Sequence, residues 1–173
     1  MSLPSSPLPA SAPPPFGGPV VVDLPLPWPP SRHLGRADVS GTWSWSGEKQ
    51  RLHGEMTWGA QAEGLPLHVH GGLVAALCDE AMGWTCWMAG WVAAGARVST
   101  DFRVAQHVGD TVTIEAWVEA VAGRKLSLRA EVTKAGRVCA SAEGLFVAIA
   151  PPDWSVFAGW PALDRFDSVR GPA

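Results

Sequence analysis

The feature that most constrains the fold is an apolar segment of 18 or so residues that opens with Gly71-Gly72 and runs to about Ala89. Its hydrophobic residues cover nearly every face at helical spacing, which predicts a helix buried on all sides. A helix of this length spans roughly 27 Å. Because Asp79 and Glu80 interrupt it, we expect a central helix and not a membrane span. The apolar residues are Leu73, Val74, Ala75, Ala76, Leu77, Cys78, Ala81, Met82, Trp84, Cys86, Trp87 and Met88.

The chain after this helix alternates apolar and polar residues, which is typical of strands with one buried face. Short glycine-containing turns at 122–124 and 135–137 predict antiparallel hairpins. One buried helix followed by an antiparallel meander predicts an α+β domain whose sheet curls around the helix. The expected strands are 42–46 and 51–60 before the helix, with a loop at 61–69, and 98–104, 112–119, 125–132 and 138–148 after it.

Proline content divides the chain of 173 residues, a length that suits one domain. Residues 1–40 form a proline-rich N-terminal extension, expected to be an extended tail in which Val20–Val22 and Trp28 are apolar anchors. The domain is expected over 41–150. Residues 151–173, rich in Pro, Gly and Trp, form a C-terminal tail expected on the surface. There, Trp154, Phe157 and Trp160 are candidates for packing onto the domain or a partner chain.

Charge and cysteine content exclude several classes of function. The net charge is −3 and the 13 basic residues are scattered, which does not favour binding to nucleic acid or to an anionic membrane. The three cysteines form no CxxC pair and no disulfide framework, which fits a reducing compartment. The N-terminus lacks the pattern of a secretory signal. We therefore expect a soluble, cytoplasmic protein.

The segment His70-Gly71-Gly72 carries the strongest chemical signal, because it begins the predicted helix. The first amides of a helix have no partner within it, and they lie at the positive end of the helix dipole. Such amides can hold a carbonyl oxygen on which negative charge develops. Asp79, two turns further on, interrupts the apolar face; burial of its carboxyl would raise its pKa and make it a better general base near neutral pH.

This combination resembles the hotdog-fold thioesterases, in the branch that is similar to phenylacetyl-CoA thioesterase and includes 4-hydroxybenzoyl-CoA thioesterases with a helix-borne acid. The resemblance covers about 43–149. It rests on the His-Gly-Gly segment, an acid seven positions after Gly72, and the order of the strands. It also includes Val-Gly-Asp at 108–110, Gly-Arg-Lys at 123–125 and the closing strand at 142–147. The resemblance implies an antiparallel sheet wrapped around a long central helix.

The resemblance also implies an activity, the hydrolysis of an acyl-CoA thioester to CoA and a carboxylic acid. The Gly71 amide, with that of Gly72, would hold the thioester carbonyl, and Asp79 would attack that carbonyl or activate water. His70 would shape the turn and contact the thioester region. Two protomers would share each site, which implies a homodimer or a homotetramer. No metal or cofactor is expected, since coenzyme A is part of the substrate.

The sequence departs from this family at Gly64, where many relatives carry Asn or Gln six residues before the histidine. Gln61 or His68 are candidate substitutes for that amide. Further candidate substrate-binding residues are Ser99 and Thr100 on the strand after the helix, and Glu80, for which a solvated or interface position is the better interpretation.

Other interpretations also fit the sequence. Asp79 can be a structural carboxylate paired with Arg97 or Arg103. The departure at Gly64 favours a non-catalytic acyl-CoA-binding protein on the same fold, and a hotdog hydratase or dehydratase is a further alternative. A serine nucleophile is not expected because there is no G-x-S-x-G elbow. His68 and His70, two residues apart on a loop, are poor evidence for a metal site.

Overall fold

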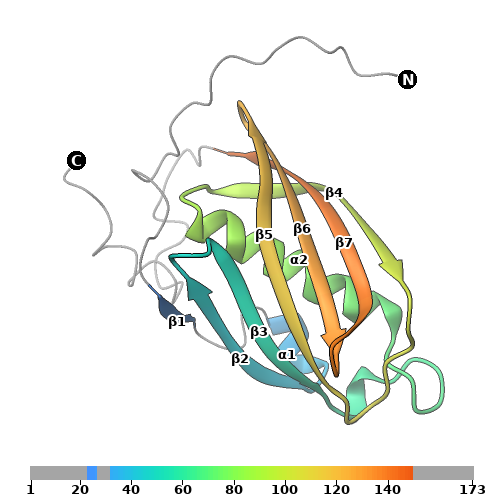
Figure 1. Cartoon of the computed structure of the whole chain (residues 1–173). Coiled ribbons are helices and arrows are strands. Elements are labelled where there is room, and N and C mark those ends of the chain that lie inside the picture. Colours follow the sequence, from blue (N-terminus) through green and yellow to red (C-terminus); the bar gives the residue numbers. More distant parts are fainter. Residues whose placement is uncertain (1–22, 27–31, 150–173) are drawn as a thin grey trace, which may run out of the picture.

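The computed structural model describes residues 23–26 and 32–149, and it confirms the expected α+β hotdog architecture. Seven antiparallel strands form one curved sheet, and the long helix α2 lies along its concave side (Figure 1). The strand order is β1-β2-β3-β5-β6-β7-β4. The elements are β1 (Leu24–Leu26), α1 (Arg32–Arg36), β2 (Val39–Ser46), β3 (Arg51–Trp58), the 3-10 turn η1 (Ala60–Ala62), α2 (Gly71–Met88), β4 (Ala93–Phe102), β5 (Thr111–Ala122), β6 (Lys125–Lys134) and β7 (Arg137–Ala148).

The meander β5-β6-β7 follows from the two predicted turns. Ala122 pairs with Lys125 and Lys134 pairs with Arg137, so each hairpin loop has two residues. At the second turn Ala135 and Gly136 both have positive φ, 47° and 76°. This geometry matches the twist of antiparallel strands, and glycine adopts it without steric cost.

Strand β4 crosses over to the far edge of the sheet, where it pairs only with β7 (Figure 1). Val98 lies opposite Gly144, Thr100 opposite Ala142 and Phe102 opposite Ala140. These β7 residues are buried against α2, so the three β4 residues share the helix-facing side of the sheet. No described strand pairs with the other edge of β4. The long edge strand is therefore open to a further protein contact.

The burial of α2 differs from the prediction of a helix buried on all sides. Its core-facing residues, among them Leu77, Cys78 and Met82, are fully buried between the helix and the sheet. One side remains at least partly accessible, and we call it the accessible stripe. It consists of Gly72, Ala76, Asp79, Gly83 and Trp87. Because these positions are three or four residues apart, they lie on one face of the helix, so a single protomer covers α2 only in part.

The N-terminal extension also differs from the prediction of an extended tail up to about residue 40. Strand β1 pairs with β2, and helix α1 buries Leu34 in the core. The expected anchors Val20–Val22 and Trp28, and the C-terminal Trp154, Phe157 and Trp160, lie outside the described residues. None of the described helices has the length and apolar character needed to cross a membrane.

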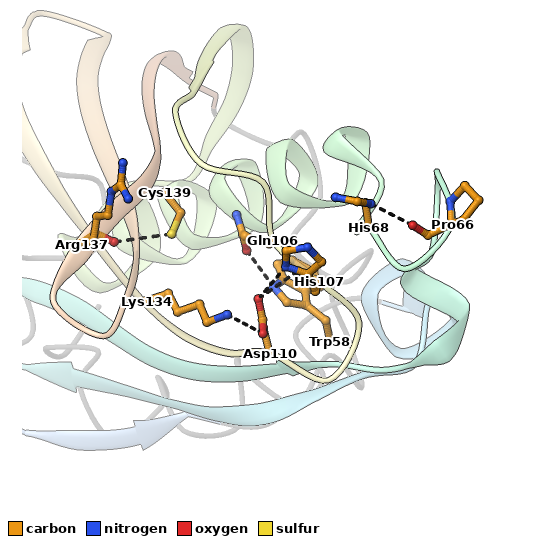
Figure 2. A network of polar contacts seen from close by, with 9 residues as sticks. All are labelled: Trp58, Pro66, His68, Gln106, His107, Asp110, Lys134, Arg137 and Cys139. Carbon is orange, nitrogen blue, oxygen red and sulfur yellow. Dashed lines mark hydrogen bonds and ion pairs between the residues drawn. The ribbon is translucent and has the colours of Figure 1, made fainter.

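The loop between β4 and β5 is fastened to the core by a buried side-chain hydrogen bond (Figure 2). The Trp58 indole N–H donates to Oε1 of Gln106 over 2.7 Å, and both residues are buried. The backbone of Gln106 in turn accepts from the Val69 amide, one residue before His70. The Asp110 carboxylate accepts from Lys134 Nζ at 2.6 Å and from the His107 amide at 2.9 Å. Burial raises the pKa of Asp110, but these hydrogen bonds outweigh it and lower the pKa overall.

We expect Gln106→Ala to destabilise the domain by about 1–3 kcal/mol, because it leaves the buried Trp58 indole donor without its acceptor. Gln61→Ala is the matched control, since Gln61 is exposed in η1. Chemical denaturation of both variants measures the difference. Equal stability of the two variants would contradict a role of this hydrogen bond in holding the loop.

Candidate functional site

The start of α2 leaves one backbone amide available. His70 is the N-cap residue, and its ring Nδ1 accepts from the Gly72 amide over 2.9 Å. The Leu73 and Val74 amides donate to the His70 carbonyl at 2.9 and 3.4 Å. Gly71 is the remaining residue of the first turn, and no described group accepts from its amide. The sequence suggested both glycine amides as donors to a ligand, whereas the Gly72 amide is occupied by His70.

The cap also fixes the tautomer of the neutral His70 ring. Its Nδ1 must carry a lone pair to accept from Gly72, so the proton of the neutral ring is on Nε2. The ring is exposed. The start of the helix therefore presents an N–H donor from the imidazole as well as the Gly71 amide.

Gly64 is packed directly against His70. A Cβ placed on Gly64 would lie 2.8 Å from His70 Cα and 2.9 Å from its Cβ. Contacts this short with backbone would require the loop or the helix start to move. The position at which related proteins are expected to carry Asn or Gln thus has no room for a side chain in this conformation.

Asp79 lies on the accessible stripe and not, as expected, within a buried face. Its side chain is exposed in the single protomer, and its Oδ1 lies 3.4 Å from where a Cβ of Gly95 on β4 would be. Desolvation by the surrounding groups raises its pKa. Among the described residues no Arg, Lys or His forms an ion pair with it; Arg103 instead donates to Ser141 Oγ. The alternative of a carboxylate paired with Arg97 or Arg103 is therefore wrong for this protomer.

The two cysteines on α2 are poor nucleophiles. Burial, and then the nearby charge of Asp79, raise the pKa of both Cys78 and Cys86 to about 12. Both thiols therefore stay protonated near neutral pH, and a thiolate is the reactive form of cysteine. Asp79 is the more suitable base or nucleophile on this helix.

Gly71 and Asp79 are well separated within one protomer. Eight residues of helix span about 12 Å along the axis. A carbonyl held by the Gly71 amide would therefore lie out of reach of the Asp79 carboxylate of the same chain.

The other candidate residues occupy different surroundings. Thr100 is half-buried on the helix-facing side of β4, whereas Ser99 is exposed on the opposite side, across from Glu143. Gln61 is exposed in η1, and Glu80 is half-buried beside Asp79. His68 donates from Nδ1 to the Pro66 carbonyl at 2.8 Å and packs against the His107 ring, with 4.6 Å between centroids (Figure 2). Residues 23–26 and 32–149 contain no group of three or more potential His, Cys, Asp or Glu metal ligands.

Two residues near these groups were not predicted from the sequence. Phe102 is 57% exposed, and its ring lies beside Gly71. The alternation of β4 places it on the apolar side of the strand, so it resembled a core residue. Gly95 leaves space for the Asp79 carboxylate, and a single glycine in a strand gives no signal of such a contact.

Residues 68–141 match the sequence profile of the thioesterase superfamily. A crystal structure of a thioesterase superfamily protein is 30% identical, with a TM-score of 0.59, and the match covers 62% of this chain but only 53% of that one. The PaaI protein from the phenylacetic acid degradation operon of E. coli is 20% identical, with a TM-score of 0.60 and coverage of 69% and 86%.

A hypothetical thioesterase from Streptococcus pneumoniae, solved with coenzyme A, is 17% identical, with a TM-score of 0.56 and coverage of 58% and 79%. None of the curated proteins compared with the chain matches it. The profile match includes the start of α2 and Asp79, and the described part of the chain shares the hotdog architecture of these structures.

Proposed function

We propose that this domain hydrolyses an acyl-CoA thioester to coenzyme A and a carboxylic acid. The observation that carries the proposal is that α2 presents an amide donor at its start and a carboxyl group further along. Its first turn presents one amide, that of Gly71, without an acceptor among the described residues. Further along the same helix, Asp79 has a raised pKa and forms no ion pair with a described residue. These are the two groups that acyl transfer to water requires.

The distance between these groups leads us to propose that two protomers complete each site. A carbonyl bound at Gly71 would be attacked with the help of Asp79 of the partner subunit, since the Asp79 carboxylate of the same chain is about 12 Å away along the helix. The accessible stripe and the open edge of β4 are the surfaces available for such a homodimer. Pairing of two such dimers would give the tetramer.

In the proposed reaction the thioester carbonyl oxygen accepts from the Gly71 amide. Asp79 takes a proton from water, and the resulting hydroxide adds to the carbonyl carbon; alternatively the carboxylate attacks that carbon itself, and after CoA has left, water hydrolyses the mixed anhydride to the carboxylic acid and free Asp79. The tetrahedral oxyanion is stabilised by the Gly71 N–H, with the Nε2–H of His70 as a second donor nearby. The carbon–sulfur bond then breaks, and the CoA thiolate leaves and is protonated. Loss of one oxyanion donor typically lowers turnover on the order of 10²–10³-fold.

The coenzyme A in the Streptococcus pneumoniae structure supports binding of a CoA thioester to this fold. A second candidate function, acyl-CoA binding without turnover, is favoured by Gly64. Its contact with His70 leaves no room there for an amide side chain that would orient substrate or water. Measurement of turnover distinguishes the two functions.

Asp79→Asn is expected to lower kcat for CoA release by at least about 100-fold, because the amide is neither base nor nucleophile. Its affinity for acyl-CoA should change little. Free thiol release from a panel of acyl-CoAs, together with calorimetric binding, measures both quantities.

The neighbouring Glu80→Gln variant is the matched control for this experiment, since it removes a carboxylate one position along the same helix. We expect it to retain most of the activity. Full activity in Asp79→Asn, or absence of thiol release by the wild type from every acyl-CoA, would contradict hydrolysis. Tight binding without release would favour the second candidate.

The raised pKa of Asp79 predicts the pH dependence of the reaction. Only the ionised carboxylate can act, so kcat/KM should rise with pH through a pKa above the usual range for aspartate of about 3.9. If kcat/KM instead rose with a pKa at or below that range, the assignment of this ionisation to Asp79 would be contradicted. The profile of kcat/KM between pH 4 and 8 measures this.

The same shift predicts an effect on stability. The pKa of Asp79 is higher in the folded protein than in the unfolded chain. Its contribution to the free energy of unfolding is therefore fully present below the pKa of the unfolded chain, and it is lost as pH rises through the pKa of the folded protein. Asp79→Asn should therefore gain Tm relative to wild type as pH rises through that window. Parallel thermal melts at pH 4 and pH 7 test this, and an unchanged difference in Tm would argue against it.

A further inference from the structure

We infer that Phe102 is a specificity-determining residue whose ring contacts the acyl group of the substrate and selects apolar acyl chains. The inference rests on the proposed function, because it concerns the carbonyl held by the Gly71 amide. It adds a residue and a substrate class to that site.

The position of the ring carries the inference. Phe102 Cε1 and Cζ both lie 3.5 Å from where a Cβ of Gly71 would be, so the ring is within van der Waals distance of the helix start. The Phe102 side chain is nevertheless 57% exposed. Anything bound at the Gly71 amide therefore meets an aromatic surface that the protomer itself does not cover.

Its local structure explains why the ring stays exposed at this place. Phe102 is the last residue of the edge strand β4, and its cross-strand partner on β7 is the small Ala140. The following amides of Arg103 and Val104 both donate to the Cys139 carbonyl, at 2.8 and 3.0 Å, which fixes the end of the strand. The ring therefore projects from an anchored backbone without being packed against the sheet.

The charged neighbours of Phe102 lie on the other side of the strand. Asp101 is paired with Ser141 in the ladder, and the Arg103 guanidinium donates to the Ser141 hydroxyl at 3.2 Å. Side chains alternate along a strand, so these charges and the Phe102 ring face opposite sides. The wall beside Gly71 is accordingly apolar.

An apolar wall next to the oxyanion donor favours one part of the thioester. An aliphatic or aromatic acyl chain gains free energy when it covers the ring, whereas a carboxylate at the end of the chain would lose hydration against it. The pantetheine arm of coenzyme A contains amide groups that would also lose hydrogen bonds to water there. We therefore place the acyl group, and not the pantetheine arm, against Phe102.

The test compares two acyl-CoAs of equal chain length, butyryl-CoA and succinyl-CoA, which differ by a terminal carboxylate. The quantity measured is the ratio of their kcat/KM values in wild type, Phe102→Ala and Phe102→Leu. We expect Phe102→Ala to lower kcat/KM for butyryl-CoA about tenfold, within the range for altered apolar pockets, and to leave succinyl-CoA within about twofold. Phe102→Leu should keep most of the preference.

Leu65→Ala is the matched control, because Leu65 is also an exposed apolar residue, at 73%, and lies in the loop before α2. It should leave the ratio unchanged. An equal loss for both substrates in Phe102→Ala, or a change of oligomeric state in sedimentation, would overturn the inference, since the ring would then contact the shared CoA moiety or a second protomer. A ratio unchanged from wild type would overturn it as well.

Calorimetric Kd values for the same pairs keep this result separate from the proposed function. If the wild type binds both acyl-CoAs but releases no thiol, hydrolysis is contradicted, while the ratio of Kd values still decides the role of Phe102. If the wild type releases thiol and the ratio does not respond to Phe102→Ala, only the inference about Phe102 fails.

Discussion

The hydrogen bond from the Gly72 amide to the His70 ring is the interaction on which the candidate site depends. A helix start has several amides without partners, and which of them remains available decides where a ligand can bind. Here the imidazole takes one amide and the His70 carbonyl takes two, so the Gly71 amide remains. The same bond holds the imidazole proton on Nε2. One capping interaction therefore selects both potential donors to a bound carbonyl.

The loop before the helix packs closely against this cap. Gly64 lies so close to His70 that no side chain fits between them, and the Val69 amide is held by the Gln106 backbone. The side chain of Gln106 is fixed in turn by the buried Trp58 (Figure 2). The orientation of the His70 ring is thus supported by contacts that reach back to the end of β3. An amide side chain at position 64 would have to displace the His70 backbone and, with it, this ring.

The sequence predicted the architecture well because periodicity reports burial directly. The all-round apolar helix gave the limits of α2 within a residue, and alternation together with the two glycine turns gave β5, β6 and β7. The sequence could not predict that a single protomer leaves Asp79 exposed, because apolar residues cover surfaces between subunits as well as cores. Helix α1 was missed for a different reason: the prolines around it outweighed the short apolar pattern that buries Leu34.

The groups that the sequence did not indicate share one physical cause, since each depends on a contact between segments far apart in the chain. Gly95 matters because Asp79 lies over it, and Phe102 because β4 ends beside the start of α2. Strand β4 follows α2 in the chain and lies at the far edge of the sheet, so among the described strands it is the one that lies along α2 while its outer edge stays open. At one end it lies beside Gly71, and near the other it lies beside Asp79. Any second protomer that covered this edge would therefore approach both groups at once, which is the arrangement that the proposed two-chain site needs, because about 12 Å of helix separate Gly71 from Asp79 within one chain.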